Sequence, residues 1–121
     1  MQSFSFGDSP ELADELLALV LAGKKTATCW AASVGLKGVE VGGRWRVNDG
    51  RGRPRAIIET IELTRRSFKD VEASFAYDEG EGDRSLASWR SAHRNYFSRE
   101  GTYSEDMELF CERFKVVEML D

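Results

Sequence analysis

Two short stretches of the chain combine side chains that could do acid–base or nucleophilic chemistry. The first, Gly23-Lys24-Lys25-Thr26-Ala27-Thr28, brings two amines and two hydroxyls within a few residues. A threonine hydroxyl becomes a nucleophile when a neighbouring base takes its proton, and a lysine can be that base if its pKa falls toward neutrality. Lys25 and Thr28 are therefore a candidate catalytic pair, and a solvated pair of lysines is the alternative interpretation.

The spacing of this pair sets a condition on the backbone. A flat strand would place Thr26 and Thr28 on one face and Lys25 on the other, so Lys25 can meet Thr28 only from an irregular turn. A nucleotide-binding P-loop is excluded because the position that must be its first glycine is Ala18. The helix also has the wrong direction for a phosphate site. Gly23 is expected at the C-terminus of a helix, whereas phosphates bind at helix N-termini.

The second stretch, Asp78-Glu79-Gly80-Glu81-Gly82-Asp83, holds four carboxylates that repel one another. Its glycines permit a backbone that aims one carboxylate inward, although a plain solvated turn is the alternative. The spacing is not that of an EF-hand calcium loop. The single histidine, His93, is interpreted as a helix-face residue, so we expect neither a metal ion nor a cofactor.

Local patterns predict the elements that must position these groups. Ser9 as N-cap, Pro10 at the first helical position and Gly23 as the stop predict a helix over Pro10 to Ala22. The other expected elements are a strand from Lys24 to Trp30, hairpin strands at 44–47 and 55–63, helices at 67–76 and 85–98, and a final strand at 107–120. The order predicts an α+β fold, in which five to six strands form a small, mixed, highly curved sheet or a partly closed β-barrel with flanking helices.

Composition is that of one globular domain spanning residues 1–121, with 41% apolar and 31% charged residues. The longest uncharged apolar run, Leu16 to Gly23, is too short to span a membrane, and no secretory pattern is present, so we expect a cytoplasmic protein without a membrane partner. Cys29 and Cys111 are expected to be buried free thiols.

Charge is unevenly distributed along the chain. Residues 24–69 carry eleven Lys and Arg against four Asp and Glu, whereas the remaining residues carry six against seventeen. The basic segment could meet a phosphate, but the acidic remainder would repel a long nucleic-acid backbone. A small anionic or nucleoside-like ligand fits this balance better than duplex DNA does.

Several motifs, in their order and spacing, together resemble the ASCH domain family, and in particular its small stand-alone bacterial members. They are Phe6-Gly7-Asp8, the helix end and turn at 21–28, the acidic loop at 79–83 with Ser85-Leu86 and Trp89-Arg90, and the ending at 107–114. The resemblance spans nearly the whole chain. It implies a PUA-like β-barrel with flanking helices and a cleft beside the Gly-x-Lys turn, in a fold associated with RNA and modified nucleosides.

The resemblance also implies an activity. Small bacterial relatives include an amidohydrolase that removes the acetyl group from N4-acetylcytidine, and another relative has been described as a ribonuclease. Carried over by motif, the catalytic residues of the amidohydrolase fall on Lys25, Thr28 and Glu81, with Glu79 as the rival of Glu81. Lys25, neutral in the cleft, would take the proton of Thr28, or else Glu81 would activate water that Thr28 positions.

The expected substrate-binding residues surround that cleft: Lys24, Thr26, Trp30, Glu79, Trp89, Arg90 and Ser104. Trp30 stands where the family often has an arginine and could stack on a base instead. The leading hypothesis is metal-free hydrolysis of an N4-acylated cytosine nucleoside by a monomer or homodimer. Two alternatives remain, namely cleavage of single-stranded RNA by Lys25 and Ser104, and recognition of RNA or a modified base without chemistry.

Overall fold

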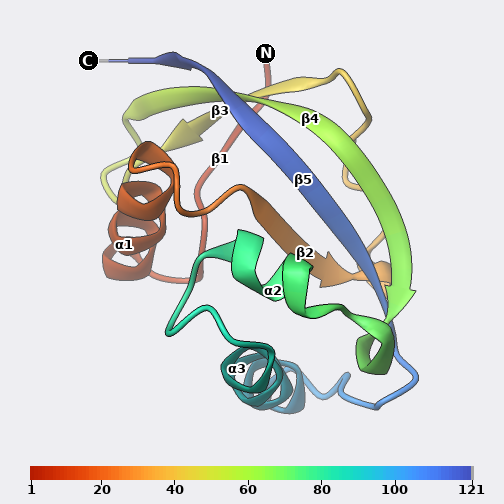
Figure 1. Cartoon of the computed structure of the whole chain (residues 1–121). Coiled ribbons are helices and arrows are strands. Elements are labelled where there is room, and N and C mark those ends of the chain that lie inside the picture. Colours follow the sequence, from red (N-terminus) through yellow and green to blue (C-terminus); the bar gives the residue numbers. More distant parts are fainter. Residues whose placement is uncertain (121) are drawn as a thin grey trace.

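The computed structural model describes residues 1–120. The chain forms an α+β fold in which one strongly curved sheet is flanked by three α-helices (Figure 1). The strands are β1 (Ser3–Phe4), β2 (Ala27–Ala31), β3 (Arg44–Asn48), β4 (Pro54–Ser67) and β5 (Glu108–Met119). The helices are α1 (Pro10–Leu21), α2 (Ala73–Glu79) and α3 (Leu86–Arg99), with short 3-10 turns η1 (Ala32–Val34) and η2 (Phe68–Asp70).

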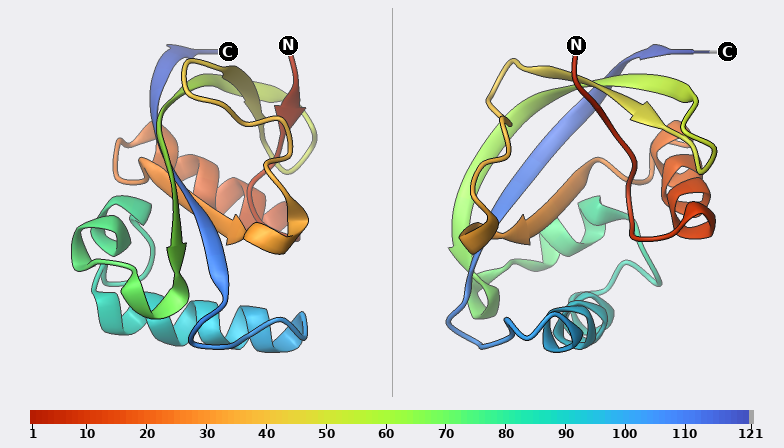
Figure 2. Two further views of the ribbon diagram at one scale, coloured as in Figure 1. Left: turned by 90° about the vertical axis from the view of Figure 1, so that its right-hand side faces the viewer. Right: turned by 180° about the vertical axis from the view of Figure 1, so that it is seen from behind.

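The sheet has the order β1-β3-β4-β5-β2, and its pairs are antiparallel except for β1 with β3. β4 and β5 are long and bend together across the molecule, with register shifts at Ile57/Ile58 and Thr60/Glu62 that increase the bend (Figure 2). Within residues 1–120 the predicted barrel is not closed. β1 and β2 lie at opposite edges, and these short strands leave the sheet open.

Helix α1 forms as the sequence predicts. Ser9 Oγ accepts a hydrogen bond from the Leu12 amide at 3.1 Å, and Pro10 occupies the first turn. Beyond the helix, the amides of Lys24 and Lys25 both donate to the Leu19 carbonyl, at 2.9 and 3.1 Å. The strand predicted from Lys24 therefore starts three residues later, and Lys25 lies in an irregular turn.

The single helix predicted over residues 67–76 is wrong. The segment is divided into η2 and α2, because Val71 between them is extended and buried in the core. Phe68, Val71 and Phe75 are apolar at helical spacing, but they contact the core from two separate turns. Helix α2 begins at Ala73 and ends at Glu79, so it includes the first residue of the predicted acidic loop at 79–83.

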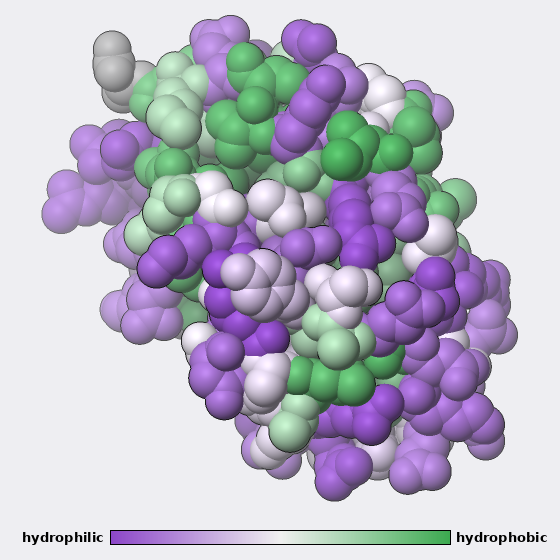
Figure 3. Space-filling model, in the orientation of Figure 1, coloured by the Kyte–Doolittle hydropathy of each residue, from purple (hydrophilic) through white to green (hydrophobic). Residues whose placement is uncertain are grey.

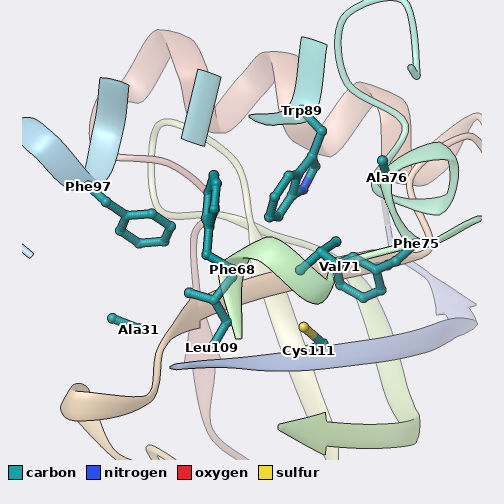
Figure 4. Packing of buried hydrophobic residues seen from close by; sticks show 10 residues of the cluster. Ala31, Phe68, Val71, Phe75, Ala76, Trp89, Phe97, Leu109 and Cys111 are labelled. Atoms are coloured by element: carbon teal, nitrogen blue, oxygen red, sulfur yellow. The ribbon is translucent and has the colours of Figure 1, made fainter. Parts of the chain in front are cut away.

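The core consists of two hydrophobic clusters. The α2–α3 cluster packs these helices against β2 and the start of β5, with Trp89, Phe68 and Phe97 at its centre (Figure 4). The α1 cluster packs α1 against β1, β3, β4 and the middle of β5 through these buried residues: Phe6, Leu16, Leu17, Val20, Val47, Ala56, Ile58 and Phe114. The two clusters hold the two walls of a cleft.

The surface is mixed in character. Hydrophilic side chains cover most of the face in Figure 3, and separate apolar patches lie between them. Within residues 1–120, none of the helices has the length and apolar character needed to cross a membrane.

Candidate active site

A cleft of about 730 Å³ lies between the two clusters, within the size range of small-molecule sites. The turn before β2 contributes Lys25, β2 contributes Thr28, and the end of α2 with the following loop contributes Glu79 and Glu81. The structure therefore brings together the three predicted catalytic residues and the predicted rival of Glu81.

Lys25 is a buried lysine, with 1% of its surface exposed. Its Nζ donates to Glu81 Oε2 at 2.7 Å and to the Ala27 carbonyl at 2.8 Å, and lies 3.4 Å from Glu79 Oε1. The ring of Phe6 lies below the ammonium, 5.4 Å from Nζ to the ring centre. The irregular turn thus points this side chain into the cleft that Thr28 also lines.

The expectation of an uncharged Lys25 is wrong for this arrangement. Burial alone lowers the pKa of Lys25, but the charges of Glu79 and Glu81 and the hydrogen bond to Glu81 outweigh burial, so the pKa is raised above its usual 10.5. Lys25 is therefore an ammonium at neutral pH.

Glu79 is held from three sides. Its Oε2 accepts a hydrogen bond from the Trp89 indole at 2.5 Å and lies 3.7 Å from His93 Nε2, and its Oε1 faces Lys25. His93 Nδ1 lies 2.9 Å from the Trp89 carbonyl oxygen, which can only accept, so Nδ1 carries the proton. With 2% exposure, Glu79 is a fixed counter-charge for Lys25, whereas the Glu81 side chain, 38% exposed, can reach a ligand.

The backbone joins the two halves of this network. The Thr26 amide donates to the Asp78 carbonyl at 2.7 Å, and Lys25 Nζ also lies 3.4 Å from the Glu79 carbonyl. Gly80 caps α2 with a left-handed φ of 74°, and a Cβ there would stand 2.3 Å from the Lys24 carbonyl oxygen. Only glycine allows this close approach of the acidic loop to the lysine turn.

Thr28 lies in β2 directly opposite Glu112 of β5, and both line the cleft. Within residues 1–120, its hydroxyl makes no side-chain hydrogen bond to the protein. The hydroxyl is therefore free to bind a ligand or to exchange a proton with one.

Five of the predicted substrate-binding residues do not line the cleft: Lys24, Thr26, Trp89, Arg90 and Ser104. Lys24 and Ser104 are exposed at the surface. Trp89 is buried in the α2–α3 cluster, where its role is to fix Glu79, and Arg90 donates to the Lys69 carbonyl at 3.2 Å. Of these five residues, Trp89 therefore contributes to the site only through its hydrogen bond to Glu79.

Trp30 does line the cleft. Its indole donates to the Gly35 carbonyl at 2.8 Å, which fixes the ring, and Lys37 Nζ lies 4.9 Å from the ring centre. A base that stacked on this face would take the place of the Lys37 ammonium.

Sequence reasoning misses much of the cleft lining, including Phe6, His93 and Glu112. The helical spacing of Trp89 and His93 is visible in the sequence, but it is equally typical of core packing. Glu112 has a weaker signal, because the same strand also carries the acids Glu108 and Glu118.

Within residues 1–120, one group of potential metal ligands converges, with Cys29, Glu79 and His93 atoms all within 4.8 Å of one another. Both oxygens of Glu79 already face donors, and the ammonium of Lys25 lies 3.4 Å from one of them. A bound cation would therefore meet a fixed positive charge, and the group is better described as part of the hydrogen-bonded network.

Both cysteines are free thiols, as the sequence predicts, although Cys29 is only partly buried. Burial, with the charge of Glu79 next in size, raises the pKa of Cys29 well above its usual range. The same two causes raise the pKa of Cys111 to about 12. Neither thiol is a nucleophile at neutral pH.

Comparison with known proteins identifies the family of the chain. The family model of the ASCH domain matches residues 2–118. The chain belongs to the ASCH domain family. This ASCH domain is similar to the crystal structure of an ASCH domain from Lactobacillus crispatus, with 38% identity and a TM-score of 0.87, covering 96% of this chain and 79% of that one.

A second solved structure, protein EF3133 from Enterococcus faecalis, has 31% identity and a TM-score of 0.87, covering 98% of this ASCH domain and 77% of that chain. The hypothetical protein PH0355 has 15% identity and a TM-score of 0.64, covering 86% and 93% of the two chains, and so shares the fold alone. No curated protein matches the chain.

Proposed function

We propose that this ASCH domain hydrolyses the exocyclic amide of an N4-acylated cytosine nucleoside, with N4-acetylcytidine as the simplest substrate. The observation that carries the proposal is the Lys25–Glu81 hydrogen bond of 2.7 Å inside a cleft that Thr28 also lines. This arrangement supplies an exchangeable proton and a hydroxyl group in the same cleft, and amide cleavage uses both.

The resting charge of Lys25 shapes the mechanism. A bound substrate displaces water, and the added burial favours transfer of one proton from Lys25 to Glu81. The amine then takes the Thr28 proton while Thr28 Oγ1 attacks the acyl carbon. As the bond between the acyl carbon and N4 breaks, Glu81 donates the proton that it received from Lys25 to N4. Water then hydrolyses the acyl ester and releases the acyl group from Thr28.

A variant of this mechanism uses Glu81 as the base for water, with Thr28 only positioning that water. Thr28→Val separates the two. An acyl group on Thr28, detected by mass spectrometry after rapid quenching of the parent, supports the nucleophile. Loss of turnover in Thr28→Val, with no acyl-enzyme in the parent, supports the water mechanism.

Salt bridges within the protein occupy many of the basic side chains of residues 24–69, which favours a small substrate over long RNA. Many of its cations contact acids of the protein itself: Arg44 with Glu59, Arg53 with Asp49, Arg65 with Glu108, Arg66 with Glu72 and Lys69 with Asp106. These pairs leave less positive charge for a phosphate backbone. Ser104, the residue expected to help in RNA cleavage, lies outside the cleft.

The test incubates purified protein with N4-acetylcytidine and, separately, with single-stranded RNA, following ultraviolet absorbance and chain length. We expect nucleoside turnover that is lost in Lys25→Ala and Glu81→Ala, is retained in the surface control Lys24→Ala, and changes little with salt. Lysine-dependent RNA cleavage without nucleoside turnover would replace the proposal with a ribonuclease. Salt-sensitive RNA binding without any turnover would indicate a binding module.

A further inference from the structure

A second buried acid, Glu112, lines the cleft apart from the lysine network. It lies on β5 directly opposite Thr28 on β2, so the two side chains emerge on the same face of the sheet. Glu112 is 5% exposed, and its Oε2 accepts a hydrogen bond of 2.5 Å from the Thr60 hydroxyl. That contact leaves Oε1 for a ligand.

Glu112 differs from Glu79 in having no cation beside it. Within residues 1–120, no lysine, arginine or histidine forms an ion pair with it. Burial raises the pKa of Glu112, and the Thr60 hydrogen bond and the more distant charges of Lys37 and Lys25 only partly offset burial. Burial therefore favours the protonated form of Glu112 more than in a solvated glutamate, and a protonated carboxyl group can donate a hydrogen bond.

Aromatic rings also line the cleft. Phe6 comes from the loop after β1, Trp45 from β3, and Trp30 from β2, where the Lys37 ammonium lies over its ring. Aromatic walls together with a buried polar pair match a planar ring that offers a hydrogen-bonding edge.

We infer that Glu112 and Thr60 form a subsite that recognises the edge of a cytosine ring, with Glu112 donating a hydrogen bond to the ring nitrogen N3. This inference rests on the proposed function and adds the means of base selection. N3 of cytosine accepts a hydrogen bond, whereas N3 of uracil carries a proton and would meet the donor of Glu112 with a second donor.

The subsite also fits the reaction. In cytosine the exocyclic N4 is bonded to the carbon next to N3, so a ring held at N3 by Glu112 carries its N4 substituent close by. Thr28 is the residue paired with Glu112 across the two strands. Glu112 is thus a positioning residue that presents the acyl group to the hydroxyl of Thr28.

The test uses nucleosides that cannot react, so that binding is measured without turnover. Isothermal titration of the parent compares cytidine, uridine and 3-deazacytidine, in which a C–H group replaces N3. We expect cytidine to bind about tenfold or more tightly than either analogue, the usual effect of leaving a buried polar group unpaired. Equal binding of cytidine and 3-deazacytidine, or no binding of cytidine, would overturn the inference.

Variants of Glu112 sharpen the result. Glu112→Leu removes the donor and should bind cytidine about tenfold more weakly, while its binding of 3-deazacytidine stays at the parent level. Glu112→Gln keeps a donor, because its amide oxygen can accept from Thr60 while its nitrogen donates, and should retain cytidine binding within about threefold. Glu118→Leu, on the exposed end of the same strand, is the matched control. Undiminished cytidine binding by Glu112→Leu would contradict the subsite.

The two proposals fail separately. Cytidine binding that depends on N3 and Glu112, in a protein that does not hydrolyse N4-acetylcytidine, would reject the activity and keep the subsite. Hydrolysis by a parent that binds cytidine and 3-deazacytidine equally would keep the activity and reject the subsite.

Discussion

The two ends of the cleft each bury a carboxyl group, but they surround it differently. At one end Glu79 faces the ammonium of Lys25 and the indole N–H of Trp89. At the other end Glu112 has the Thr60 hydroxyl and no adjacent cation within residues 1–120. The comparison shows that one pocket can bury one acid against a cation and another acid against only a hydroxyl group, so the two acids offer a ligand different partners.

The largest effect should come from removing the cation at the charged end. Lys25→Met leaves Glu79 buried without its counter-charge, which should lower the free energy of unfolding by about 3–5 kcal/mol. It should also reduce turnover of N4-acetylcytidine by at least about 1,000-fold. Urea unfolding and the absorbance assay measure the two effects.

A double variant guards against simple loss of folding. Lys25→Met combined with Glu79→Gln removes both charges and should recover part of the stability while leaving the protein inactive. If the double variant regained turnover, the assignment of Lys25 would be wrong. Lys24→Met, one residue away and exposed, should match the parent in both measurements.

The backbone that joins the two segments of the charged end gives the next prediction. Gly80→Ala would bring a Cβ within 2.3 Å of the Lys24 carbonyl at a left-handed φ, and should destabilise the fold by about 3 kcal/mol. Gly23 has a similar φ of 78°, but a Cβ added there would have no neighbour within 4 Å, so Gly23→Ala should cost only about 1 kcal/mol. Equal thermal shifts for the two variants would contradict this explanation.

These elements also show how far sequence reasoning reaches. Helix α1 was predictable because Ser9, Pro10 and Gly23 act through their immediate neighbours. A curved sheet with flanking helices was predictable too, but whether the sheet closes was not, because closure depends on whether two short edge strands, far apart in the chain, meet in space. The division of the 67–76 segment was hidden because Val71 fits a helical stripe as well as an extended bend.

The candidate site divides in the same way. The residue types of Lys25, Thr28 and Glu81 were predictable from motifs. The charge on Lys25 was not, since it depends on carboxylates that lie 54 and 56 residues further along the chain. Glu112 was missed because its significance lies in what it lacks, a nearby cation, and a sequence does not display that.

A smaller effect on stability and turnover should follow from removing a hydrogen bond to Glu79 while its carboxyl group is kept. Trp89→Phe deletes the indole donor and keeps most of the packing in the α2–α3 cluster, so the unfolding free energy should fall by about 1–2 kcal/mol. Turnover should fall less than in Lys25→Met. The control Tyr103→Phe also deletes a hydrogen-bonding group beside the α2–α3 cluster, but Tyr103 does not line the cleft. If Trp89→Phe and Tyr103→Phe lost the same activity, the role of the indole N–H would be unsupported.

The smallest effect on stability is expected at Glu112, and there the substitution should stabilise the fold instead of destabilising it. Because the pKa of Glu112 is raised in the folded protein, its contribution to stability is present below the usual value of 4.5 and is lost as the pH rises through the folded-state value. Glu112→Gln should therefore stabilise the fold by about 1 kcal/mol or less at pH 8, and not at pH 4. A variant that is less stable than the parent at pH 8 would show that the ionised acid is better solvated than we infer.

The hydrogen bond from the Thr26 amide to the Asp78 carbonyl has a practical consequence for redesign. Chain segments that are tied together through their main chains cannot be exchanged one at a time, because a replaced loop of another length would pull its partner out of place. Anyone who transplants the acidic loop into another scaffold, or shortens it to alter substrate choice, must therefore carry the lysine turn with it as a single cassette.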